Sequence, residues 1–209
     1  MITPTEREIP GPSGPLEVLF DAPDGEARGV VVLGHPLPTQ GGTMHTKMVF
    51  QAAKGLARAG YLVLRFNFRG VGRSAGKFDN GPGEMDDFRA ALDYMSKAYP
   101  GLPLLAGGAS YGSWVGMTVG AEDPRVSALI GIAPAIMLRD FAGVEASTKP
   151  KFLVHGEMDQ IIPIKAVRSF YARMPEPKEL VVIDRANHAF DGQATEVGDA
   201  VEDLLGDFS

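Results

Sequence analysis

The sequence predicts an α/β fold, a mostly parallel eight-stranded sheet with helices on both faces. Short runs rich in Val, Leu and Ile alternate along the chain with longer stretches in which apolar residues recur every three or four positions. The runs are almost continuously apolar, which is typical of strands buried on both faces of a parallel sheet. With 209 residues, 44% of them hydrophobic, the chain can bury a substantial core, so we expect one domain spanning residues 1–209.

The first two strands are expected to form a hairpin, because two extended segments flank the turn sequence Gly11-Pro12-Ser13-Gly14. Regular alternation with helices follows, so the first strand pairs are antiparallel and the others parallel. In chain order, the predicted strands are residues 6–9, 16–20, 29–33, 61–66, 102–106, 128–132, 151–155 and 179–183.

Five stretches have the apolar spacing or the boundary residues of helices. They cover residues 48–59, 85–95 and 111–120, a segment that begins near Pro163, and a last helix through residues 197–205. Between the predicted strands 128–132 and 151–155 the chain has room for one short helix at most. We therefore expect no cap domain.

The composition excludes several classes of function. Twenty Lys and Arg against 26 Asp and Glu give a net charge of −6, and no basic run predicts a nucleic-acid or membrane partner. With no cysteine, disulfides, zinc-thiolate clusters and a thiol nucleophile are all excluded. The first residues lack the basic and apolar regions of a secretory leader, and no apolar run approaches 18 residues. A cytoplasmic enzyme with a small-molecule substrate fits these features, and a homodimer stays open.

The most informative motif is Gly108-Ala109-Ser110-Tyr111-Gly112, which lies between a predicted strand and a predicted helix. In that setting G-x-S-x-G forms a nucleophile elbow, a strained turn that holds the serine hydroxyl clear of the fold. The same motif also occurs by chance at strand-to-helix turns of glycine-rich chains. Assigning Ser110 as a nucleophile therefore depends on a base and an acid elsewhere in the chain.

Candidates for both follow in the chain order of the α/β-hydrolase triad. Asp159 comes after the predicted strand 151–155, and His188 comes after the predicted strand 179–183. All three candidates lie at carboxyl ends of strands, where parallel sheets place their ligand sites. Asp184 and Asp191 are the alternative acids, but Asp184 is too near His188 in sequence to span the imidazole and Asp191 lies beyond it.

The other three histidines have different predicted roles. His35 comes before the serine, whereas the base of the α/β-hydrolase triad comes after it in the chain. We therefore expect His35 to fix the following loop by hydrogen bonding. His155 is expected to pack beside the acid loop. His45 is interpreted either as a pocket residue or as a solvated residue at a helix start.

No motif predicts a cofactor or a metal. The glycine-rich segment 70–77 superficially suggests a phosphate loop, but it lacks the spacing of both the Walker and the dinucleotide-binding motifs. No cluster of His, Asp and Glu has metal-ligand spacing. We therefore expect neither a cofactor nor a metal site.

Three further segments are informative: His35-Pro36-Leu37-Pro38, Gly41-Gly42-Thr43-Met44 and the segment from Arg65 to Ser74. With these segments, the chain resembles small, lidless α/β-hydrolases of bacteria related to dienelactone hydrolases. Dienelactone hydrolases use a cysteine nucleophile, which this chain lacks, so esterases are the closer analogy. The resemblance implies an oxyanion hole made by the backbone N–H groups of Leu37 and Tyr111.

These observations predict a carboxylesterase that cleaves short-chain esters with Ser110, Asp159 and His188. The same triad also serves peptidases, thioesterases and perhydrolases, and the fold can host a ligand-binding receptor with slow turnover. Because no lid is expected, we predict an open site that prefers short acyl chains. Met137, Phe141, Val144 and Met158 are the predicted apolar wall of that site.

Overall fold

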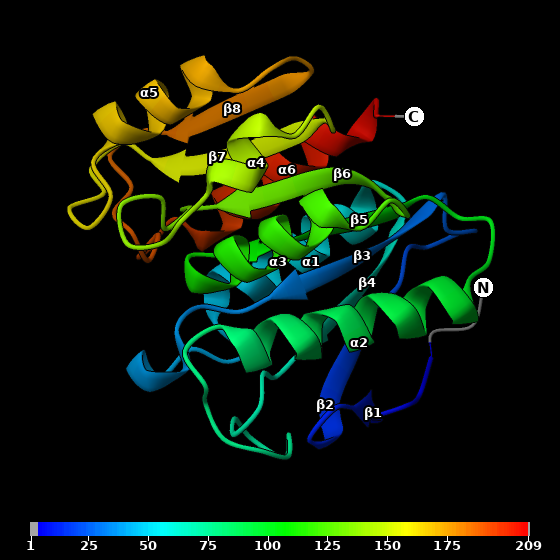
Figure 1. Cartoon of the computed structure of the whole chain (residues 1–209). Coiled ribbons are helices and arrows are strands. Elements are labelled where there is room, and N and C mark those ends of the chain that lie inside the picture. The colour runs from blue at the N-terminus through cyan, green and yellow to red at the C-terminus, as the bar shows by residue number, and fades with distance from the viewer. Residues whose placement is uncertain (1–3, 209) are drawn as a thin grey trace.

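The computed structural model describes residues 4–208 and contains one eight-stranded sheet with the strand order β1-β2-β4-β3-β5-β6-β7-β8 (Figure 1). The strands are β1 (Glu8–Gly11), β2 (Gly14–Asp21), β3 (Gly29–Gly34), β4 (Tyr61–Phe66), β5 (Leu104–Ala109), β6 (Val126–Ile132), β7 (Lys151–Gly156) and β8 (Lys178–Ile183). Strand β2 pairs antiparallel with both β1 and β4, and the remaining pairs are parallel. The predicted fold class is confirmed, while residues 1–3 and 209 of the predicted domain lie outside the described residues.

Helices cover both faces of the sheet (Figure 1). One face carries α1 (Lys47–Arg58) and α6 (Ala194–Gly206), and the other carries α2 (Pro82–Ala98), α3 (Tyr111–Glu122), α4 (Ala142–Ala146) and α5 (Ile164–Arg173). Strand β3 shows why its sequence is continuously apolar. Val30 and Val32 join the core under α2 and α3, whereas Val31 and Leu33 join the core under α1 and α6.

Strand β5 differs from the prediction, because it begins at Leu104 and continues through two glycines to Ala109. Glycine has a low propensity for strands. Here Gly107 and Gly108 pair with β3 on one side and with β6 on the other, so neighbours on both sides override that propensity. The strand therefore runs directly into the serine of the elbow.

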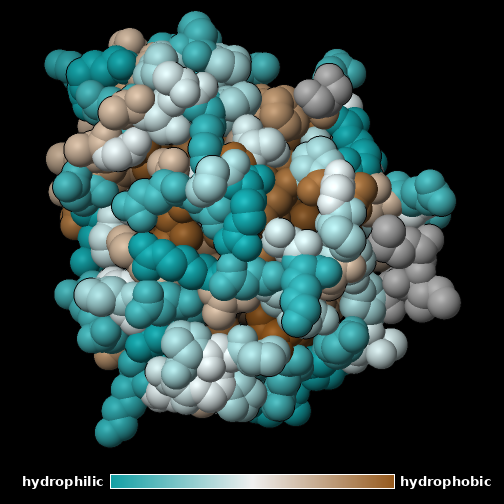
Figure 2. Space-filling model, turned by 45° about the vertical axis from the view of Figure 1, so that its right-hand side comes forward, coloured by the Kyte–Doolittle hydropathy of each residue, from teal (hydrophilic) through white to brown (hydrophobic). Residues whose placement is uncertain are grey.

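The connection from β6 to β7, residues 133–150, contains one helix, the five-residue α4. As predicted, the described residues include no cap domain. Figure 2 shows one face of the molecule, on which hydrophilic residues protrude and hydrophobic residues lie mainly in hollows. None of the helices within residues 4–208 is both long and apolar enough to cross a membrane.

Candidate active site

Ser110 occupies the turn between β5 and α3 in a strained conformation. Its backbone has φ 51° and ψ −113°, a conformation that residues other than glycine rarely adopt. The amide of Ser110 donates a hydrogen bond of 2.8 Å to the carbonyl of Ile132 on the neighbouring strand β6. The strain is therefore held by the sheet, and the serine side chain is left to project from the turn.

The flanking glycines let the turn pack directly against β3. A Cβ atom at Gly108 would lie 2.5 Å from the carbonyl oxygen of Gly34, and a Cβ atom at Gly112 would overlap the backbone of Gly34. Because real Cβ atoms do not approach backbone so closely, both positions require glycine. The G-x-S-x-G spacing thus has a packing reason in this fold.

The structure brings Ser110, His188 and Asp159 together from three separate loops. Ser110 Oγ lies 2.9 Å from His188 Nε2, and His188 Nδ1 lies 2.6 Å from Asp159 Oδ2. The alternative acids are elsewhere: Asp184 is exposed beside Arg185, and Asp191 accepts a hydrogen bond from Asn187. Among the predicted acids, Asp159 is the one that contacts the imidazole.

Asp159 is held as an ionised acceptor. Burial acts to raise the pKa of its carboxyl, but the hydrogen bonds with His188 and from the amides of Ile162 and Ile161 lower this pKa below its usual value overall. Both amides donate to Oδ1 at 2.8 Å, which leaves Oδ2 for His188. An ionised, anchored carboxylate orients the imidazole and stabilises its positive charge when it takes up a proton.

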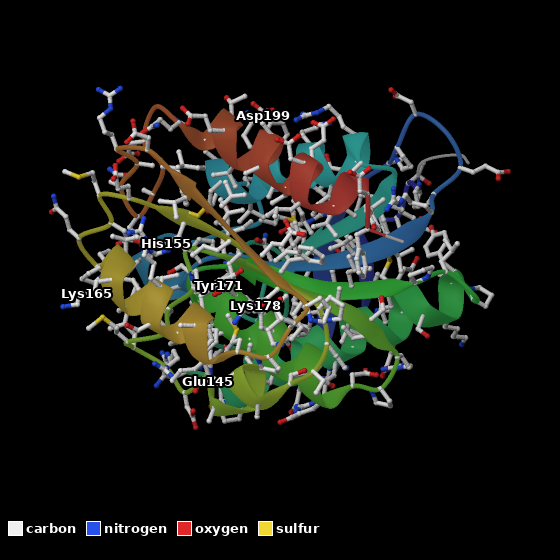
Figure 3. All side chains as sticks on the ribbon, turned by 90° about the horizontal axis from the view of Figure 1, so that it is seen from above. Glu145, His155, Lys165, Tyr171, Lys178 and Asp199 are labelled. Carbon is white, nitrogen blue, oxygen red and sulfur yellow. The ribbon has the colours of Figure 1, made fainter. Side chains whose placement is uncertain are left out.

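The two buried histidines have structural contacts. His35 Nδ1 lies 2.7 Å from the carbonyl of Pro36, and its Nε2 accepts a 3.1 Å hydrogen bond from the amide of Phe68, so the ring fixes the loop as expected. His155 lies within the body of the molecule, whereas Lys165 projects from its surface (Figure 3). The ring of His155 lies 2.8 Å from the carbonyl of Ile162, beside the acid loop, as the sequence predicts.

His45 is exposed and is not among the residues that line the cavity beside Ser110. The second of its two interpretations, a solvated histidine near a helix start, therefore describes its position.

The two residues of the predicted oxyanion hole lie at the same cavity as Ser110. Leu37 and Tyr111 both line it, and in the described part of the chain neither amide has a hydrogen-bond acceptor. The carbonyl of Leu37, in contrast, accepts hydrogen bonds from Gln40 and Gly42. Pro36 and Pro38, on either side of Leu37, have no N–H to offer, so Leu37 supplies the one N–H of these three residues.

The cavity beside Ser110 is small, at about 160 Å³. It is lined by Leu37, Gln40, Ser110, Tyr111, Ala135, Leu138, Arg139, Ile161 and His188. None of the four residues predicted as an apolar wall lines this cavity, and two of them, Phe141 and Val144, are buried at 5% and 0% exposure. Val144 lies on the short helix α4, and Phe141 directly precedes that helix. Met137 and Met158 are exposed, and Met137 and Phe141 line a neighbouring groove instead.

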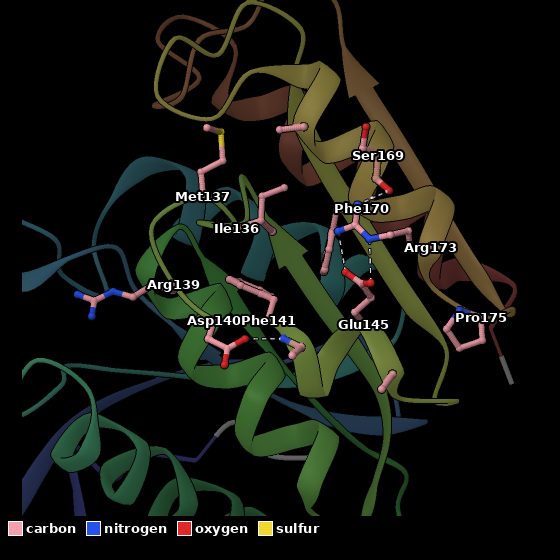
Figure 4. A pocket seen from close by; sticks show the side chains of 13 residues that line it. Ile136, Met137, Arg139, Asp140, Phe141, Glu145, Ser169, Phe170, Arg173 and Pro175 are labelled. Atoms are coloured by element: carbon pink, nitrogen blue, oxygen red, sulfur yellow. Dashed lines mark hydrogen bonds and ion pairs between the residues drawn. The ribbon is translucent and has the colours of Figure 1, made fainter.

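A larger groove of about 680 Å³ adjoins the cavity and runs between α4 and α5. Figure 4 shows its side chains, among which Arg173 donates two hydrogen bonds to the carboxylate of Glu145. Arg139 is the residue that lines both the groove and the cavity. Sequence analysis missed Arg139, Leu138 and Ile161, because no motif or spacing distinguishes them.

Comparisons with known proteins show the family and the fold of the chain. The family described as serine aminopeptidase S33 matches residues 25–146 of the chain. An α/β serine hydrolase homologue from Coxiella burnetii is 34% identical, with a TM-score of 0.91 over 98% of this chain and 99% of that chain. A serine hydrolase without a lid from Xanthomonas campestris is also 34% identical, with a TM-score of 0.88 over 96% of this chain and 94% of that chain.

One curated relative has a named activity. A monoacylglycerol lipase from Mycolicibacterium smegmatis is 30% identical over 78% of this chain, and the match spans 58% of the lipase. The link to dienelactone hydrolases that the sequence suggests stays a prediction.

Proposed function

Since the chain belongs to the α/β-hydrolase family described as serine aminopeptidase S33, we propose that it is a serine carboxylesterase that cleaves short-chain esters through an acyl-enzyme. The observation that carries the proposal is the continuous hydrogen-bonded path from Ser110 Oγ through His188 to Asp159, with contacts of 2.9 and 2.6 Å. A nucleophile, a base and an orienting acid in this order are the parts that acyl transfer by serine requires.

In the acylation half-reaction, Ser110 Oγ attacks the ester carbonyl carbon while His188 Nε2 takes the hydroxyl proton. Asp159 keeps the Nδ1 proton in place and stabilises the imidazolium. The carbonyl oxygen becomes an oxyanion, which the amides of Leu37 and Tyr111 bind. Each such donor contributes about 3 kcal/mol in comparable sites. The proton on His188 then passes to the leaving alcohol.

In the deacylation half-reaction, water replaces the alcohol. His188 removes a proton from this water, which attacks the acyl carbon, and the proton returns to Ser110 Oγ as the acid is released. Every group that takes part in these two half-reactions belongs to the chain or to the reactants.

An ester substrate fits the pocket better than the N-terminus of a peptide does. An aminopeptidase has to bind a free ammonium group near the nucleophile, for which an acidic side chain is the natural partner. No Asp or Glu is among the described residues that line the cavity beside Ser110, and Arg139 brings a positive charge to it. That charge would repel an ammonium group.

The size of the cavity favours short acyl chains. At about 160 Å³ it is below the roughly 300–1,000 Å³ typical of small-molecule sites. Longer chains would extend past Leu138 and Ile161, which are 62% and 51% exposed, and would bury little additional surface there.

The proposal is tested by labelling with a fluorophosphonate probe and by assays on p-nitrophenyl esters, with matched p-nitroanilides as amide substrates. We expect the wild-type protein to be labelled at one serine and to hydrolyse the esters faster than the anilides. Ser110→Ala should abolish labelling and turnover while leaving the circular dichroism spectrum unchanged.

Two outcomes would contradict the proposal. Labelling that persists at Ser113 in the Ser110→Ala variant would exclude Ser110 as the nucleophile. A burst of one acyl equivalent without steady turnover on any ester would favour a ligand-binding receptor.

A further inference from the structure

Arg139 stands at the boundary between the cavity that contains Ser110 and the larger groove between α4 and α5. It follows Leu138 in the connection from β6 to β7. In Figure 4 its side chain points away from the Glu145–Arg173 pair. Arg139 is therefore placed to meet whatever part of a substrate extends beyond the small cavity.

The guanidinium of Arg139 is held in position without an acidic partner. Nη2 donates a 2.6 Å hydrogen bond to Oδ1 of Asn80. The guanidinium also lies over the rings of Tyr111 and Trp114, with Cζ 5.2 and 4.8 Å from the two ring centroids. Within residues 4–208, no carboxylate lies within 4.0 Å of it. A fixed guanidinium loses little side-chain freedom when it binds an anion.

Arg173, the other arginine that lines the groove, is already neutralised. Arg173 in the groove makes two contacts with Glu145, at 2.8 and 2.7 Å. Among the residues lining the cavity, Arg139 and His188 are the ones that can carry positive charge, and His188 is committed to Ser110 and Asp159. In a chain of net charge −6, Arg139 is an available cation beside the reacting serine.

We propose that Arg139 forms a carboxylate-binding subsite, so that the enzyme prefers esters that carry a carboxylate a few carbons from the ester group. This inference rests on the proposed esterase function and names the substrate class of the same site. Arginine presents N–H groups in a planar fork that matches the two oxygens of a carboxylate. Its Nε and Nη1 atoms have no acceptor among the described residues and remain available to a substrate.

The kinetic test compares esters that differ in one terminal group. Monoethyl adipate carries a carboxylate where ethyl hexanoate has a methyl group, and 4-acetoxybutyrate differs from butyl acetate in the same way. These pairs place the charge on the acyl side and on the alcohol side, respectively. For at least one pair, we expect Arg139→Gln to lower the ratio of kcat/KM for the charged ester to that for the neutral ester by about tenfold. Most of the loss should appear in KM, because a group remote from the reaction binds equally in the ground and transition states.

Arg168→Gln is the matched control. Arg168 is exposed on α5, does not line the cavity, and its replacement removes the same charge. The ratio should stay at its wild-type value in this variant. If Arg139→Gln damages the pocket for neutral esters as well, Arg139→Lys keeps the charge without the planar fork, and its ratio should lie between those of the wild type and Arg139→Gln.

A binding test does not depend on turnover. Trp114 is the only tryptophan of the chain and stacks on Arg139, so its fluorescence reports on this guanidinium. In the Ser110→Ala variant, monoethyl adipate should change the fluorescence in a saturable way, and added salt should weaken the binding. The double variant Ser110→Ala/Arg139→Gln should show no saturable change.

The two assays separate failure of the subsite from failure of the esterase function. Saturable binding that requires Arg139, with no turnover of any ester, would retain the subsite and contradict the proposed function. Turnover of esters at the same charged-to-neutral ratio in the wild type and in Arg139→Gln, with no fluorescence change, would overturn the subsite. Arg139 would then serve only to fasten its loop to Asn80.

Discussion

Acidification should destabilise this protein through His35, a buried histidine that is neutral in the folded state. Burial lowers the pKa of His35 from 6.5 to about 4. The geometry agrees, because Nε2 accepts a hydrogen bond from the amide of Phe68 and a proton on this nitrogen would face another donor. Between pH 6.5 and 4, the unfolded chain therefore binds a proton that the folded protein does not.

The sign and size of the effect follow from this difference. The free energy of unfolding falls as the pH falls through this window, because the proton binds the unfolded state preferentially. The two pKa values set a maximum loss of about 3 kcal/mol, reached below pH 4, of which about 2 kcal/mol is lost by pH 5. Above pH 7 His35 contributes almost no pH dependence.

The assay is urea denaturation of the wild type and of His35→Gln at pH 7 and pH 5, followed by the fluorescence of Trp114 and by circular dichroism. Glutamine can donate and accept hydrogen bonds but does not titrate in this range. Between pH 7 and pH 5, the free energy of unfolding of the wild type should fall by about 2 kcal/mol more than that of the variant. His155, whose pKa burial also lowers, is present in both proteins and cancels in the comparison. Equal losses in the two proteins would refute the assignment of this proton uptake to His35.

Three further predictions concern the site. Asp159→Asn should lower kcat by up to about 10⁴, because the imidazole loses the partner that fixes its tautomer, and a comparable loss in Asp184→Asn instead would show that the acid is wrongly assigned. Values of kcat/KM for p-nitrophenyl esters should peak between acetyl and hexanoyl and fall by dodecanoyl, because a cavity of about 160 Å³ buries few methylenes of about 0.8 kcal/mol each, and a maximum at long chains would contradict this. Gly112→Ala should lower the free energy of unfolding in urea by about 1–3 kcal/mol, because its Cβ would overlap the backbone of Gly34. Gly143→Ala, where a Cβ meets nothing within 4 Å, is its control, and equal stability of the two variants would argue against the packing role of Gly112.

The candidate residues could be found in the sequence because each follows a buried strand. The runs at β5, β7 and β8 are apolar enough to be recognised, and parallel strands place their carboxyl ends at one edge of the sheet. Chain order then predicted that Ser110, Asp159 and His188 would meet, and hydrogen bonds of 2.9 and 2.6 Å join them in the structure. Local pattern and topology were sufficient for this part.

The pocket could not be predicted in the same way, because its walls depend on where individual side chains turn in the loop from β6 to β7. The sequence does not indicate that Phe141 and Val144 are buried while Leu138 and Arg139 line the cavity beside the serine. It also gives no sign that Asn80, Tyr111 and Trp114 meet Arg139, since these contacts join segments separated by up to 59 residues. The sequence by itself determined the fold class and the order of the reacting groups, because both follow from periodic burial along strands. Only the tertiary structure decided the shape and charge of the pocket, because these arise from side chains brought together by folding rather than by spacing.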